Sequence, residues 1–444
     1  MSVYDEYRSK LRTADEAVRL VKNGDWVDYA SNNGFPKTLD AALAKRRDEL
    51  WGVKIRGNLI SGPIQVAECD TGFEHFVYNS WFCSAYERRL IDAHRAFFIP
   101  MDFRNMGAYY ENYLTVNVAM LAVTPMNDKG YFSRSTCQGL PKAIIDKADI
   151  VILEVNEALP WMCGGEESYV HISEADVVVE AGSYPLLEMK APRPSETEVR
   201  IAQNLLPFIK NGATVQLGIG GVPNALGELI ADSDLKNLGM HTELAADGYL
   251  AMYRAGKLTN RCKTLHPGKS VAAIAMGTRD FYDWIDHNDE FLGLPLSYVN
   301  DPHVLAKNNS MISINGCLNV DLYGQVNAES VGFRQISGTG GQLDFVAGAV
   351  HSAGGKAFLC LPSTHTGKDG TVQSRIVPHF NMDIITTPRS MCHYIVTEYG
   401  VVNLAGLTTW ERAEALISVA HPDFRDGLIK NAQEQHIWLP SNKR

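Results

Sequence analysis

Apolar runs rich in β-branched residues alternate along the chain with segments whose apolar positions recur at helical spacing. Residues 148–156 (ADIVILEVN) and 269–277 (KSVAAIAMG) are typical of strands buried on both faces. In residues 407–417, apolar side chains recur every three or four positions, which predicts a helix with one buried face. This alternation predicts open α/β domains with mostly parallel sheets.

A weak internal repeat divides the chain in two. The sequence Lys-Asn-Gly at 22–24 is followed by an extended run, a Gly-Phe-Pro loop and a helical segment, and the same order returns after Lys-Asn-Gly at 210–212. A second pair of similar segments links residues 114–135 with 310–330. Two such pairs in the same order predict two related α/β domains, 1–192 and 193–444, joined at the proline-rich linker 191–199.

Composition narrows the possible functions. The 444 residues include 41 Lys and Arg against 51 Asp and Glu, a net charge of -10, which argues against a nucleic-acid partner. The first residues mix acids and bases, and no uncharged apolar run is long enough to span a bilayer, so we expect a cytoplasmic protein without membrane attachment.

Common cofactor and metal signatures are missing from the sequence. The eight cysteines form no C-x-x-C pair, so a zinc site is not expected and free thiols are favoured. There is no phosphate-binding G-x-x-x-x-G-K-[ST], no H-E-x-x-H and no G-x-S-x-G. We therefore predict neither a metal nor a permanently bound cofactor.

Two glycine clusters are candidate ligand loops. Gly218, Ile219, Gly220, Gly221 and Val222 follow an apolar strand and open a helix, where backbone amides can meet an anion or a carbonyl oxygen. On the residues alone, a tight turn without a ligand is the favoured interpretation, because glycine-rich turns form ordinary loops more often than ligand sites. The second cluster, residues 338–341, has three glycines in four positions.

Glu243 is the carboxylate that the chain order places beside the first glycine loop. A parallel β-α-β unit would bring it to the carboxyl end of the next strand. On the residues alone, Glu329 and Glu398 compete with it, and His241 is a structural residue or a modifier of Glu243. Lys368, in a Gly-Lys-Asp-Gly turn, is either a solvated loop residue or a contact for a phosphate or thioester.

Six motifs together resemble the acetyl-CoA hydrolase/transferase family. They are GIGGVPNALG, LGMHTELAADG, NVDLYGQVNAES, QISGTGGQLDFV, VTEYGVVNLAGL and ALISVAHPDFRD, in this order along the chain. The resemblance extends from residue 13 to residues 436–438 and is strongest in the second half. It implies a CoA-transferase-like fold.

The resemblance also implies roles for particular residues. Glu243 matches the glutamate that forms the enzyme-CoA thioester in this family, and Asn300 matches the asparagine that binds the thioester oxygen. The remaining matches are contacts to CoA: Gly218, Ile219, Gly220, Gly221, Val222, Leu318, Gly341 and Lys368.

The implied activity is ping-pong transfer of CoA from a short-chain acyl-CoA to a carboxylic acid, with butyryl-CoA and acetate as the expected pair. CoA would act as a co-substrate, and a homo-oligomer is expected. The alternatives are transfer to 4-hydroxybutyrate or another short-chain acid, hydrolysis of acyl-CoA through the same intermediate, and non-catalytic sensing of acyl-CoA.

Overall fold

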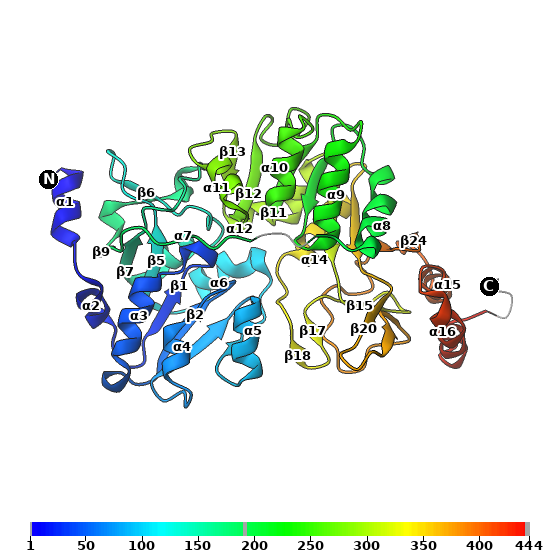
Figure 1. The fold of residues 1–444 in the computed structure, drawn as a ribbon, viewed down its shortest axis with the longest axis horizontal. Helices are drawn as coiled ribbons and strands as arrows, with labels where there is room; N and C mark the ends of the chain where they lie inside the picture. The colour runs from blue at the N-terminus through cyan, green and yellow to red at the C-terminus, as the bar shows by residue number, and fades with distance from the viewer. Residues whose placement is uncertain (1, 190–192, 440–444) are drawn as a thin grey trace. The chain divides into compact units, whose positions relative to one another are not determined.

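A computed structural model describes residues 2–189 and 193–439 (Figure 1), with the side chain of Pro141 excepted. The chain divides into two compact units. The first comprises Met1–Met189, Val271–Val299 and Gln335–Gly340, and the second comprises Lys190–Ser270, Asn300–Arg334 and Gly341–Arg444.

The first unit is built on a seven-stranded sheet with strand order β4-β3-β2-β1-β5-β7-β9, in which every pairing is parallel. An antiparallel pair, β6 and β8, stands apart from it. The strands are β1 (Trp26–Tyr29), β2 (Val53–Gly57), β3 (Phe76–Ser80), β4 (Phe97–Phe98), β5 (Val116–Val123), β6 (Tyr131–Ser133), β7 (Ala148–Val155), β8 (Tyr169–His171) and β9 (Val177–Glu180).

Short helices lie before and between the strands of this sheet along the chain. They are α1 (Val3–Lys10), α2 (Ala14–Ala17), α3 (Lys37–Lys45), α4 (Gln65–Cys69), α5 (Ala85–Asp92), α6 (Met106–Asn112) and α7 (Pro141–Lys147). The returning segment 271–299 holds most of β12 (Ser270–Ala275), then α11 (Arg279–Ile285), β13 (Phe291–Gly293) and α12 (Leu296–Val299).

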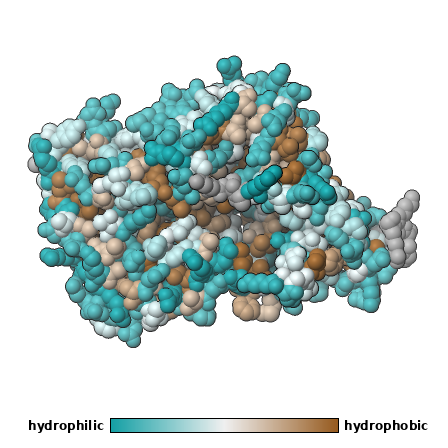
Figure 2. All heavy atoms as spheres, in the orientation of Figure 1, coloured by the Kyte–Doolittle hydropathy of each residue, from teal (hydrophilic) through white to brown (hydrophobic). Residues whose placement is uncertain are grey.

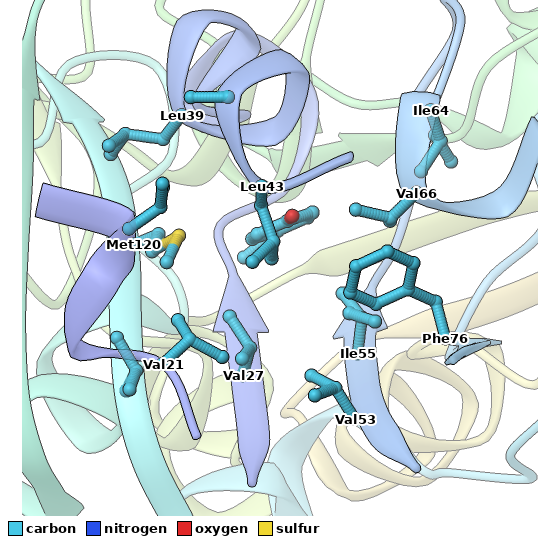
Figure 3. Close-up of a cluster of buried hydrophobic side chains, with 14 of the residues drawn as sticks. Val21, Val27, Leu39, Leu43, Val53, Ile55, Ile64, Val66, Phe76 and Met120 are labelled. Carbon is cyan, nitrogen blue, oxygen red and sulfur yellow. The ribbon is translucent and has the colours of Figure 1, made fainter. Parts of the chain in front are cut away.

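The core of the first unit lies between this sheet and its helices (Figure 3). Leu43 points from α3 toward Val27 on β1, and Leu39 lies on the side of Met120 on β5; all four side chains are fully buried. The buried aliphatic side chains on β1 and β2 explain the apolar character of these strands, since a parallel sheet covered by helices exposes little surface to water.

The second unit is also built on a mostly parallel sheet. Its strands follow the order β11-β10-β14-β19-β23-β24, and only the last pairing is antiparallel. They are β10 (Thr214–Leu217), β11 (Gly239–Ala245), β14 (Met311–Gly316), β19 (Lys356–Cys360), β23 (Tyr394–Thr397) and β24 (Gly400–Asn403).

The helices of this unit include the row α8 (Glu196–Leu205), α9 (Gly221–Asp232) and α10 (Asp247–Arg254), in which α9 packs against both neighbours (Figure 1). The others are α13 (Pro302–Lys307), α14 (Gln342–His351), α15 (Thr409–Ser418) and α16 (Pro422–Glu434). Short strands complete the chain: β15 (Asn319–Asp321), β16 (Val326–Asn327), β17 (Ser330–Val331), β18 (Arg334–Gln335), β20 (Thr364–Thr366), β21 (Val372–Ser374) and β22 (Ile376–Val377).

The predicted fold class, α/β with mostly parallel sheets, is confirmed. The two repeats also have the predicted element order: β1 and α3 follow the first Lys-Asn-Gly, and β10 and α9 follow the second. The glycine of each turn has a positive φ, +79° at Gly24 and +77° at Gly212, a conformation that favours glycine. Residues 191 and 192 of the predicted linker lie outside the described residues, and from Glu196 onward the linker is helix α8.

The visible face is mainly hydrophilic, with apolar atoms in separate groups (Figure 2). Within residues 2–189 and 193–439, no helix is both long and apolar enough to cross a lipid bilayer.

Candidate active site

Glu243 and the first glycine loop lie at the same edge of the second sheet. The parallel pairing of β10 with β11 sets Thr214 opposite Gly239 and Val215 opposite Met240. Further along, the Thr242 hydroxyl donates to the Leu217 carbonyl at 3.5 Å. Because Leu217 ends β10 and the glycine loop follows it, the loop begins beside the strand position that precedes Glu243.

A carboxamide joins two carboxylates at this site. Asn300 Nδ2 donates to Glu243 Oε2 at 2.6 Å and to Asp344 Oδ2 at 3.4 Å. Asn300 and Asp344 are fully buried, whereas Glu243 is partly exposed. The amide therefore holds an accessible carboxylate in place while its NH₂ group, a donor, faces the atoms where negative charge would develop.

Gly341 packs directly against this pair. A Cβ atom at this position would lie 2.1 Å from both Asn300 Nδ2 and Glu243 Oε2. No side chain fits there unless the pair moves. Gly341 immediately precedes α14, the helix that carries Asp344, so the start of this helix supplies both a close backbone approach and the buried acid.

The loop formed by residues 218–222 is open to ligands at its centre. Ile219 is 47 % exposed, and Gly220 has φ +121° with nothing near its Cα on the side where a Cβ would project. Gly221 begins α9, and a Cβ there would collide with the Glu198 carboxylate at 2.0 Å. Backbone amides at such a helix start can bind an anion or a carbonyl oxygen.

Leu318 and Lys368 lie on other elements of the second unit. Leu318 is partly buried, and its backbone bonds to Asn327 and Arg375. Lys368 is exposed in the turn between β20 and β21. Neither residue takes part in the contacts of Glu243, Asn300 and Gly341 described above.

The two competing acids, Glu329 and Glu398, accept hydrogen bonds from residues of neighbouring loops. Glu398 accepts hydrogen bonds from the Ser363 backbone at 2.9 Å and from its hydroxyl at 2.6 Å. Glu329 is buried and accepts from the Thr386 hydroxyl at 2.9 Å. His241 is fully buried, with Nδ1 3.3 Å from the Asn308 amide nitrogen, which supports the structural interpretation of this histidine.

Asp344 is the site residue that the sequence analysis missed. It stands three residues after Gly341, within the motif QISGTGGQLDFV. An acid in the first turn of a helix is ordinarily a surface charge that interacts favourably with the helix dipole. The sequence position of Asp344 therefore does not distinguish it as a site residue. Its complete burial is the property that distinguishes it, and this depends on tertiary packing.

Two family models match the chain. The acetyl-CoA hydrolase/transferase N-terminal domain matches residues 1–187, and the C-terminal domain of the same family matches residues 277–432.

Full-length relatives agree with these matches. The chain is 45 % identical to a butyryl-CoA:acetate CoA-transferase of Anaerostipes caccae, covering 100 % of both chains. It is 40 % identical to a 4-hydroxybutyrate coenzyme A transferase of Clostridium kluyveri, covering 97 % of this chain and 98 % of that one. Among solved structures, RipA from Yersinia pestis matches with a TM-score of 0.90 at 34 % identity, covering 98 % of this chain and 100 % of that one.

Proposed function

The chain belongs to the acetyl-CoA hydrolase/transferase family, and we propose that it transfers CoA between butyryl-CoA and acetate. The observation that carries the proposal is the partly exposed Glu243 carboxylate, held at 2.6 Å by the buried Asn300 amide. The full-length similarity to a butyryl-CoA:acetate CoA-transferase supports the choice of substrates.

Glu243 is the nucleophile in this proposal. Its carboxylate attacks the thioester carbonyl of butyryl-CoA. The CoA thiolate departs, and a mixed glutamyl-butyryl anhydride remains on the enzyme. The thiolate then attacks the glutamyl carbonyl, which releases butyrate and forms a glutamyl-CoA thioester. Acetate attacks this thioester to give a glutamyl-acetyl anhydride, and the thiolate takes the acetyl group, which restores the carboxylate.

The neighbouring groups stabilise and position the reacting atoms. Asn300 Nδ2 donates to the oxygen on which negative charge develops, a type of interaction worth about 100- to 1000-fold in rate. Asp344 keeps the donor side of that amide turned toward the site, because the reversed amide would set its oxygen against two carboxylates. The proposed CoA contacts are residues 218–222, Leu318, Gly341 and Lys368.

A second acceptor, 4-hydroxybutyrate, is favoured by the 40 % identity to the Clostridium kluyveri enzyme. One hydroxyl changes acceptor preference by only about 1–3 kcal/mol in an apolar pocket, so acceptors must be compared directly. Cytoplasmic location and a homo-oligomeric state stay predictions from the sequence.

The test is a steady-state assay with butyryl-CoA and a panel of acetate, propionate and 4-hydroxybutyrate, in which acyl-CoA products are separated and free thiol is titrated. We expect acetyl-CoA to form with parallel double-reciprocal lines and little free thiol. A Glu243→Gln preparation serves as the control for contaminating activity. Thiol release without an acceptor acid would instead identify a hydrolase, and 4-hydroxybutyryl-CoA as the best product would reassign the acceptor.

A further inference from the structure

Three polar side chains lie side by side on β10 and β14, two neighbouring strands in the middle of the second sheet. Gln216 stands opposite Ser313 in their parallel pairing, and Asn315 follows two residues later on the same face as Ser313. Gln216 is 3 % exposed and Ser313 is fully buried, whereas Asn315 is partly exposed. Polar side chains are costly to bury among the mostly apolar residues of these strands, so the cluster calls for a role beyond packing.

Hydrogen bonds fix the orientation of both amides in this cluster. The backbone N–H of Ile314 donates to Gln216 Oε1 at 3.2 Å, and the Ser313 hydroxyl donates to the same atom at 2.7 Å. Because a backbone N–H can only donate, the Gln216 atom that it meets must be the oxygen. Gln216 Nε2 then donates to Asn315 Oδ1 at 3.0 Å, and Asn315 Nδ2 donates to Ser313 Oγ at 2.9 Å. The Asn315 side chain is therefore held in one orientation.

Asn315 Oδ1 can accept one more hydrogen bond. A carbonyl oxygen has two lone pairs, and Gln216 Nε2 uses one of them. No other residue that the structure describes donates to this oxygen. The space next to Asn315 is open, because Gly316 is exposed and has no atom within 4 Å on the side where a Cβ would project. A ligand can thus reach the partly exposed side chain.

Asn315 lies among the segments that we propose as contacts for CoA. A Cβ at Gly218, the first residue of the glycine loop, would lie 3.6 Å from Asn315 Oδ1. Leu318 follows three residues later on the same segment. Gln342, the first residue of α14, donates through Nε2 to the Gly316 carbonyl at 2.9 Å. A CoA molecule that touches these segments therefore passes close to Asn315.

The polar groups around the glycine loop fit an amide better than a phosphate. A Cβ at Gly221 would lie 2.0 Å from a carboxylate oxygen of Glu198, so two side-chain acceptors, Glu198 and Asn315, flank the loop. These acceptors disfavour an anion, because like charges placed together are costly. The loop itself supplies backbone N–H donors. A secondary amide has one N–H and one carbonyl, and the pantetheine arm of CoA contains two such amides.

We propose that Asn315 is a CoA-binding residue whose Oδ1 accepts a hydrogen bond from an amide N–H of the pantetheine arm. Gln216 acts through Asn315, as the positioning residue that keeps this oxygen turned toward the ligand. The inference rests on the proposed function, because it takes CoA as the ligand, and it adds to that function the part of CoA that this strand end recognises.

The first test is calorimetric titration of the full chain with S-butyl-CoA, an unreactive thioether analogue of butyryl-CoA. Two further analogues carry an ester oxygen in place of one or the other amide N–H. We expect the wild type to bind one of these about 5-fold more weakly, the effect of losing one neutral hydrogen bond. Equal affinity for all three ligands would overturn the inference alone. Failure of the wild type to bind S-butyl-CoA would overturn the proposed function and the inference with it.

Variants then assign the missing hydrogen bond to Asn315. Asn315→Leu removes the acceptor at similar size, so it should bind S-butyl-CoA about 5-fold more weakly than the wild type and no longer discriminate against the ester analogue. The matched control is Asn309→Leu, an exposed position before the amino end of β14, which should behave as the wild type. Discrimination retained by Asn315→Leu would overturn the proposal.

Gln216→Met tests the positioning role. It leaves the Asn315 amide free to rotate, so it should reduce the discrimination between S-butyl-CoA and the ester analogue while S-butyl-CoA still binds. Full discrimination by Gln216→Met would show that Gln216 does not position Asn315.

A crystal structure of the wild type with S-butyl-CoA does not rely on any variant folding. Asn315 Oδ1 should lie about 2.7–3.2 Å from an amide nitrogen of the pantetheine arm. Amide nitrogens that bond only to water or to other residues would overturn the proposal.

Discussion

Each sheet has an edge at which parallel strands end, but the two edges use their acids differently. In the first unit Glu154, Asp40 and Glu87, each no more than 1 % exposed, accept hydrogen bonds from two backbone N–H groups apiece. In the second unit, the carboxylate at the equivalent edge is partly exposed and is held by an amide side chain. Burial against backbone donors makes an acid structural, whereas partial exposure leaves it available as a nucleophile.

The strand registers of the two sheets show which positions of the two edges are equivalent. Trp26 begins β1 opposite Lys54, and Thr214 begins β10 opposite Gly239. The fourth residue after Lys54 is Asn58, and the fourth residue after Gly239 is Glu243. The first unit therefore carries a neutral amide where the second carries the proposed nucleophile, which explains why only one of two related edges is assigned the chemistry.

Removing the charge of Glu243 should have the largest effect. In Glu243→Gln both edges carry an amide, and because an amide cannot form the anhydride, we expect a loss of kcat of more than about 1000-fold. The fold should be retained, since Gln keeps the shape of the side chain. Transfer rates and circular dichroism of the purified variant measure both effects. Near-normal ping-pong transfer by this variant would show that Glu243 is not the nucleophile.

Crowding the site should have the next largest effect. In Gly341→Ala the new methyl group would lie 2.1 Å from both members of the Glu243–Asn300 pair, so they must separate. A displacement of this size typically costs about 100-fold in rate. Gly427→Ala, at a position with open space around it, is the matched control and should retain activity. Equal activity of the two variants would mean that the pair is not held as described.

A smaller effect is expected from Asp344→Asn. This change leaves the helix intact but lets a second amide compete for the orientation of Asn300, so kcat should fall by about 10-fold while KM for the acid changes little. Steady-state kinetics with separate fits of kcat and KM provide the readout. A change confined to Tm, with kcat intact, would show that Asp344 serves packing only.

The structural acids of the first unit should affect stability and leave transfer chemistry unchanged. Burial raises the pKa of Glu87 to about 7, from an ordinary value of 4.5. Between these values the folded chain keeps a proton that the unfolded chain loses, so Glu87 makes the stability fall as the pH rises through this window.

Glu87→Gln removes this titration. Relative to wild type, the free energy of unfolding of the variant should therefore increase by up to about 3 kcal/mol between pH 4.5 and pH 7. Urea denaturation across this range measures the difference, with the exposed Asp128→Asn as the control for the loss of one negative charge. A difference that stays constant with pH would contradict the assignment of a raised pKa.

The sequence was sufficient to predict the fold class, because the repeated turn glycines Gly24 and Gly212 and the strands that follow them are local signals. It also brought Glu243 to the correct sheet edge, since parallel topology alone fixes that placement. Asn300, by contrast, reaches Glu243 from a different segment, and on the residues alone nothing separated Glu243 from Glu329 and Glu398. Asp344 could not be found at all, because what distinguishes it is burial, which depends on tertiary packing.

The most direct test of the central claim is to detect the covalent intermediate on Glu243. The protein is incubated with butyryl-CoA, treated with borohydride to reduce any glutamyl thioester, digested and mapped by mass spectrometry. The account predicts CoA loading of the intact protein and reduction confined to Glu243. Turnover of butyryl-CoA and acetate with an unmodified Glu243, or with a thioester at another acid, would contradict it.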